Sequence, residues 1–197
     1  MTADGKIEIM VASTVYEFED QIEQVCGLFQ QLGYHPVNSH YKTMPVDPAK
    51  SNLENCLEAV KSCDCLFGII RPHYGSGVIG DTSITHEEMK LAISIKKPRW
   101  FIAHHNIKVA RILLKQYMYK NDSIIRPGFK YKSTAIMDDI RLIDLYNDTI
   151  LNDTPPEERI GNWTDTYSNV NDILKVIQTQ FTDKSRILGI IEKMKAL

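Results

Sequence analysis

The sequence predicts an α/β protein with a flavodoxin-like parallel sheet, helices on both faces of that sheet, and a helical extension at the C-terminal end. Strand and helix patterns alternate through residues 6–103, which is typical of parallel sheets. The segment "CDCLFGII" at residues 63–70 is a continuous apolar run of strand length, as expected for a strand covered on both faces. Only helical patterns follow residue 105, and they predict the extension.

The remaining elements are assigned from the spacing of their apolar residues. Strands are expected at residues 6–12, 34–38, 63–70 and 99–103. Helices are expected at about residues 18–32, from 52, and at 85–95, 107–119, 134–151, 168–181 and 184–196. Residues 39–50, with two prolines, and residues 152–163 are expected to be loops.

Composition excludes several classes of function. The chain has 197 residues, 43% of them hydrophobic, and a net charge of -2 with both signs mixed, so neither nucleic acid nor an anionic membrane is an expected partner. No segment approaches the roughly 20 apolar residues that span a bilayer, and the N-terminal residues lack a signal-peptide core. We expect a cytoplasmic protein with reduced cysteines, no metal site and no cofactor.

The ligand site of such a fold is expected where the strand order reverses, beyond the carboxyl ends of the first and third strands. The loops that meet there carry hydroxyls, glycines and an arginine that suit a ribose- or phosphate-bearing ligand. The candidate substrate-binding residues are Ser13, Thr14, Arg71, Tyr74, Gly75, Ser83 and Thr85, with Gly77 and Gly80 in the same loop. The glycine spacing matches neither G-x-G-x-x-G nor a phosphate-binding loop with its lysine.

Glu88 is the candidate catalytic residue. It shares a helix face with buried positions, whereas Glu87 points more toward solvent. A helix N-terminus favours the ionised carboxylate, which suits a nucleophile or a group that stabilises an oxocarbenium ion. An alternative is purely structural: Thr85-x-x-Glu88 matches a capping box. The nearby histidines are expected to be packed or solvated, with His86 exposed.

Three ordered blocks carry a resemblance to a known family. The blocks "IMVASTVYEFEDQIEQV", "CDCLFGIIRPHYGSG" and "SITHEEMKLAISIKKPRWFI" resemble the bacterial family called domain of unknown function 4062. Its layout is similar to Toll/interleukin-1 receptor (TIR) domains and nucleoside 2-deoxyribosyltransferases. The resemblance implies a TIR-like domain at residues 1–106, a helical extension at residues 107–197, and a pocket in which Glu88 acts on an N-glycosidic bond.

Two hypotheses about function remain open. The first is an enzyme that cleaves or transfers at the N-glycosidic bond of NAD or a nucleoside. The second is a non-catalytic module of a bacterial signalling or defence system, which senses a nucleotide or binds another protein chain. Self-association is expected from the resemblance, because TIR-like domains often work in assemblies.

Overall fold

The computed structural model describes residues 2, 5–75, 78–79, 81–120, 124–125 and 128–196. Its centre is a five-stranded sheet in which every neighbouring pair of strands is parallel, in the order β2-β1-β3-β6-β9. The strands are β1 (Glu8–Ser13), β2 (His35–Val37), β3 (Cys65–Ile70), β6 (Arg99–His104) and β9 (Asn162–Tyr167). All residues of β3 are buried, as its continuous apolar sequence requires.

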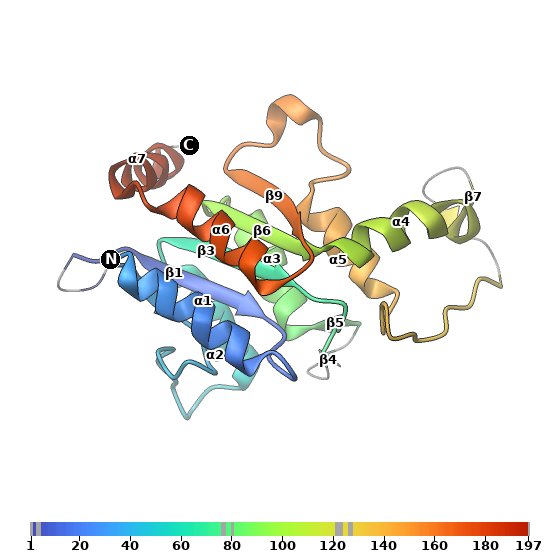
Figure 1. Ribbon diagram of the computed structural model, residues 1–197, viewed down its shortest axis with the longest axis horizontal. Helices are drawn as coiled ribbons and strands as arrows, with labels where there is room; N and C mark the ends of the chain where they lie inside the picture. The colour runs from blue at the N-terminus through green and yellow to red at the C-terminus, as the bar shows by residue number, and fades with distance from the viewer. Residues whose placement is uncertain are drawn as a thin grey trace.

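Helices cover both faces of this sheet (Figure 1). One face carries α1 (Glu19–Gln31), α6 (Val170–Phe181) and α7 (Lys184–Lys195), which share a core with residues of β1, β3 and β6. The other face carries α2 (Asn52–Ser62), α3 (Ile84–Ser94), α4 (His105–Met118) and α5 (Arg141–Thr149). The predicted parallel α/β fold, with helices on both faces, is therefore confirmed.

Smaller elements lie in the connections. β4 (Val78–Ile79) pairs with β5 (Thr82–Ser83) just before α3, and β7 (Tyr119–Lys120) pairs with β8 (Ile124–Ile125) after α4. A 3-10 helix, Pro156–Glu158, precedes β9. In the described part of the chain, no helix is both long and apolar enough to cross a membrane.

The second half of the chain differs from the sequence prediction in two places. Residues 162 and 163 were expected to lie in a loop and residues 164–167 were assigned to no element, but residues 162–167 form β9, which pairs with β6 along its full length. The helix expected at 134–151 begins only at Arg141. The second half therefore contributes a strand to the sheet as well as helices. The boundary between residues 106 and 107 stays a prediction.

The reversal of strand order falls between β1 and β3. β1 pairs with β2 on one side and with β3 on the other, and the connections leave the sheet toward opposite faces on either side of β1. In parallel α/β sheets, ligands bind beyond the carboxyl ends of the strands at this point. The strand order thus reverses at the end of β1, as predicted, and a ligand site is expected at this point.

Candidate functional site

A cavity of about 300 Å³ lies at the carboxyl edge of the sheet. The end of β1, the loop after β2 and the first turns of α2 and α3 form its walls. We call it the Glu88 cavity, because Glu88 is the single Asp or Glu among the described residues that line it. The other lining residues with hydroxyl or amide side chains are Ser13, Asn38, Ser39, Asn52, Asn55 and Thr85.

Glu88 is buried although its side chain reaches this cavity, with only 5% of its surface exposed. Burial raises the pKa of its carboxyl group to about 7, and a hydrogen bond with the Cys56 thiol acts in the opposite direction without cancelling the effect. The expectation of a fully ionised carboxylate is wrong, because Glu88 lies in the second turn of α3, where desolvation outweighs the helix dipole. Near neutral pH both protonation states are populated.

The capping alternative for Glu88 is also wrong. The N-cap of α3 is Ser83, whose hydroxyl accepts a hydrogen bond from the His86 amide. Thr85 is already inside the helix and lines the Glu88 cavity. Glu87 interacts with the Thr82 hydroxyl and with Lys90, on the outer side of the helix, as its expected orientation implies.

Ser13 and Thr14 follow each other at the end of β1 but have different roles. Ser13 lines the Glu88 cavity, and its hydroxyl donates to the Thr14 carbonyl. The Thr14 hydroxyl donates to the Tyr74 carbonyl, 3.4 Å away. Gly75 packs against the same Thr14 side chain with φ +94°, a backbone angle that favours glycine. These contacts join the loop after β1 to the loop after β3. Gly77 and Gly80 lie outside the described residues.

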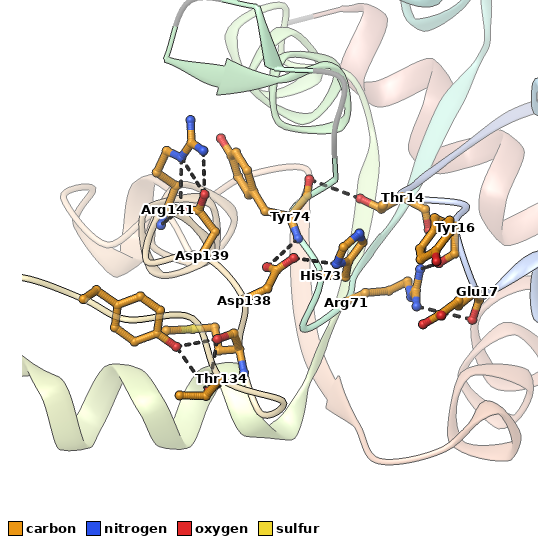
Figure 2. Close-up of polar contacts among 12 residues, drawn as sticks. Thr14, Tyr16, Glu17, Arg71, His73, Tyr74, Thr134, Asp138, Asp139 and Arg141 are labelled. Carbon is orange, nitrogen blue, oxygen red and sulfur yellow. Dashed lines mark hydrogen bonds and ion pairs between the residues drawn. The ribbon is translucent and has the colours of Figure 1, made fainter.

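Arg71 does not line the Glu88 cavity, and its side chain extends toward Tyr16 and Glu17 (Figure 2). Its guanidinium donates to the carbonyl oxygens of Thr14, Tyr16 and Glu17, and it stacks on the Phe18 ring at 4.6 Å. The prediction that Arg71 holds a ligand phosphate is therefore not supported by its position. It fixes the turn after β1, where three carbonyl groups converge on one cation.

Tyr74 is fully packed and belongs to a hydrogen-bonded chain. Its hydroxyl accepts from the Ser83 amide at 3.2 Å and lies 2.8 Å from Nδ1 of His86. Nε2 of His86 lies 2.8 Å from the Asp148 carboxylate of α5. His86 is thus buried, not exposed as expected. Tyr74 and Ser83 position the start of α3, and neither lines the Glu88 cavity.

Polar contacts connect the loop that carries Tyr74 to the segment before α5, as Figure 2 shows. The Asp138 carboxylate accepts from the Tyr74 amide and pairs with His73 at 2.5 Å. Arg141 stacks over the Tyr74 ring, with its guanidinium carbon 4.6 Å from the ring centroid. With Arg141 over its ring and only 2% of its surface exposed, Tyr74 offers no open face to a base.

Two asparagines of the site were missed by the sequence analysis. The Asn38 amide donates to the Val11 carbonyl and accepts from the Tyr41 amide. The Asn55 side chain accepts from the Asp47 amide and donates back to the Asp47 carbonyl. Together they hold the loop of residues 39–50 over the Glu88 cavity. Their positions directly after β2 and early in α2 are the signal in the sequence, whereas the hydroxyls and glycines of the loops after β1 and β3 give the more obvious one.

Within the described residues, no cluster of three or more His, Cys, Asp and Glu side chains could hold a metal ion. Cys56, the cysteine that lines the Glu88 cavity, is not activated, because burial raises the pKa of its thiol to about 12. The chemistry that this site can offer is that of one buried carboxyl group surrounded by hydroxyls and amides.

The parallel sheet and the cavity at its carboxyl edge define a doubly wound α/β protein with a ligand crevice at its topological switch point. The chain belongs to the family described as "Domain of unknown function (DUF4062)", whose model matches residues 8–181. Among solved structures, it is similar to the CMP N-glycosidase BcmB of Clostridium botulinum. That likeness has a TM-score of 0.45 and 11% sequence identity, and it covers 87% of this chain and 98% of the other. No curated protein is significantly similar to this chain.

Proposed function

We propose that the chain binds a nucleoside in the Glu88 cavity, and that the Glu88 carboxylate acts on the N-glycosidic bond. The observation that carries the proposal is the buried carboxyl group itself. Among the described residues that line the cavity, no Lys, Arg or His accompanies it. Burying an acid without a cationic partner destabilises the folded state, and such groups are concentrated at functional sites.

The size and charge of the cavity favour an uncharged nucleoside. A volume of 300 Å³ is at the lower end of the roughly 300–1,000 Å³ typical of ligand pockets, which suits one nucleoside better than a dinucleotide such as NAD. A phosphate would find no cationic side chain in the described wall. Ser13, Thr85 and Asn38 supply hydroxyl and amide groups suited to a sugar and a base.

The chemistry follows from where charge develops. When the bond between the sugar C1′ and the base nitrogen breaks, positive charge accumulates on C1′ and the ring oxygen, and an ionised carboxylate beside it stabilises that charge. Water then adds to C1′, and the departing base takes up a proton. Because the pKa of Glu88 is about 7, the active fraction rises through neutral pH. Activity is expected to increase between about pH 6 and about pH 8.

The test is release of free base, measured by chromatography, from a panel of ribonucleosides, deoxyribonucleosides, their 5′-monophosphates and NAD. Glu88→Gln keeps the shape of the side chain and should reduce release at least about 100-fold. Glu87→Gln, one position away and outside the cavity, is the matched control and should retain activity. Absence of release from every substrate, or equal activity of Glu88→Gln and the unaltered protein, would contradict the proposal.

A second candidate function is a non-catalytic module that binds another copy of the chain. One face of α4 favours it: Ile112, Leu113 and Tyr117 are each 60% exposed or more, and Val109 continues the same face at helical spacing. α4 also projects beyond the end of the sheet (Figure 1).

Sedimentation velocity over a range of protein concentrations tests the association. We expect Leu113→Ser to abolish the dimer. Lys115→Ser changes a charged side chain on the same helix and should leave the dimer intact; this pair of results supports association through α4. A monomer at all concentrations rejects this second function.

A further inference from the structure

A second cavity, of about 660 Å³, lies at the amino ends of the strands, where β6 and β9 begin. The Glu88 cavity, in contrast, lies at the carboxyl ends. The strand starts form one wall, and the end of α6 and one side of α7 form the other. Its lining is mostly apolar and includes Trp100, Trp163, Ile190 and Met194. We call it the Arg99 cavity. Its volume falls within the roughly 300–1,000 Å³ of small-molecule sites.

Arg99 is a buried cation at the base of this cavity, with only 4% of its surface exposed. Nε donates to the Asn162 side chain at 2.7 Å, and Nη1 donates to the Lys97 carbonyl at 2.9 Å. No acceptor among the described residues takes a hydrogen bond from Nη2, and no described carboxylate pairs with the guanidinium. A buried charge without a counter-charge is costly.

All charged side chains that line this cavity in the described part of the chain are positive. Arg186 and Lys193, both on α7, line it together with Arg99, whereas no Asp or Glu does so among the described residues. Burial lowers the pKa of Arg99 to about 10, so the guanidinium still carries its charge at neutral pH. Apolar walls and an unmatched positive charge are complementary to a ligand with an apolar body and an anionic end.

We propose that the Arg99 cavity binds a small apolar carboxylic acid, with its carboxylate at Nη2 of Arg99 and its hydrocarbon or aromatic body against Trp100, Trp163 and Met194. Asn162 and the Lys97 carbonyl fix the plane of the guanidinium, so little freedom is lost when the carboxylate binds. The Glu88 cavity lies at the other edge of the sheet, and this site does not depend on the function proposed there.

Tryptophan fluorescence measures occupancy directly, because both tryptophans of the chain line this cavity. Octanoate and 3-phenylpropionate are titrated against the corresponding amides, which have the same body without the charge. We expect a saturable change in emission with the acids and at least tenfold weaker binding of the amides. Equal binding of acid and amide, or no saturable change with either acid, overturns the proposal.

Arg99→Met removes the charge and keeps an apolar stem, and it should weaken acid binding at least tenfold. Lys193→Gln lies on the surface of α7 and should weaken binding about threefold, which keeps the test valid should Arg99→Met fail to fold. Acid binding of unchanged affinity in folded Arg99→Met rejects the site. An emission change that follows protein concentration without added acid also rejects it, because the occupant is then a second copy.

Discussion

Two adjacent glutamates of α3 have opposite electrostatic environments. Hydrogen bonds from Thr82 and Lys90 lower the pKa of Glu87, whereas burial raises the pKa of Glu88 to about 7. Two consecutive positions of one helix thus hold an acid whose ionised form is stabilised by hydrogen bonds from Thr82 and Lys90, and an acid whose ionised form is destabilised by burial.

This contrast predicts a pH dependence of stability with a definite sign. The pKa of Glu88 in the folded state, about 7, lies above its ordinary value of 4.5, so the folded state binds the extra proton between these values. The contribution of Glu88 is therefore most favourable below pH 4.5 and is lost as the pH rises to 7. Glu88→Gln does not titrate and should be more stable than the unaltered protein at high pH, by up to about 3 kcal/mol.

Urea unfolding at about pH 5 and about pH 8 measures this difference. Glu87→Gln serves as the control: because the folded state lowers the pKa of Glu87 below 4.5, its contribution to stability is already present at about pH 5, so its replacement should cost a similar amount at both pH values. A gain for Glu88→Gln that does not grow with pH would show that the Glu88 carboxyl is not buried in solution.

Of the residues that the sequence predicted for the site, Glu88 and Ser13 line one cavity, whereas Arg71 does not. The type and position of Arg71 are right for a phosphate ligand. However, the turn after β1 folds so that three carbonyl groups face the guanidinium. Such a convergence depends on the path of a neighbouring loop, which no local pattern records. The misread cap has a similar origin, because Ser83 and Thr85 are both acceptable N-caps and tertiary contacts select Ser83.

At the scale of elements, the start of α3 is held by the chain of hydrogen bonds from the Ser83 amide through Tyr74 and His86 to Asp148. The members come from the loop after β3, from α3 and from α5. These hydrogen bonds therefore fix the position of α3, which carries Glu88, relative to α5 in the second half of the molecule.

Tyr74→Phe should destabilise the protein by about 1–3 kcal/mol, because the Ser83 amide and the His86 ring each lose a buried partner. His73→Ala, which removes a partly exposed ion pair from the neighbouring position, should cost less than about 1 kcal/mol. Chemical denaturation of the two variants compares them. Equal losses would mean that the hydroxyl of Tyr74 contributes no more than a surface contact.

β9 was the element that sequence reasoning missed. It is an edge strand of six residues, "NWTDTY", with Tyr167 as its one buried residue. It lacks the apolar run that identified β3, and its asparagine and aspartate are depleted in strands, although its tryptophan, threonines and tyrosine are residue types that strands favour. Pairing with β6, a contact between residues about 60 positions apart, decides its conformation. The central strands and the helices with clear periodicity were predictable because burial alone specifies them.

At the scale of the whole molecule, aromatic packing joins the two halves of the chain. The Phe181 ring of α6 contacts Phe29 at 5.0 Å, Phe67 at 6.0 Å and Trp100 at 4.8 Å between ring centroids. Ile173 and Ile177 of the same helix are fully buried in this core.

A fragment of residues 1–106 should consequently fail to fold cooperatively, although it contains four of the five strands. Removing β9 and α6 leaves the edge of β6 unpaired and exposes the large aromatic side chains beneath α6. Thermal melting followed by circular dichroism should show one cooperative transition for the full chain and none for the fragment. A cooperative transition in the fragment would establish residues 1–106 as an independent domain.

The loop of residues 39–50, held by Asn38 and Asn55, forms one wall of the Glu88 cavity, and we expect its opening to admit and release the proposed nucleoside. Its amides at Tyr41 and Asp47 bond to side chains, not to a strand or helix ladder. Both bonds can therefore break in one local opening that leaves the sheet intact. In amide hydrogen exchange, these two positions should exchange together and much faster than β1, and a bound nucleoside should slow them selectively. The dwell time of a ligand would then be set by a loop, and not by the global stability of the fold.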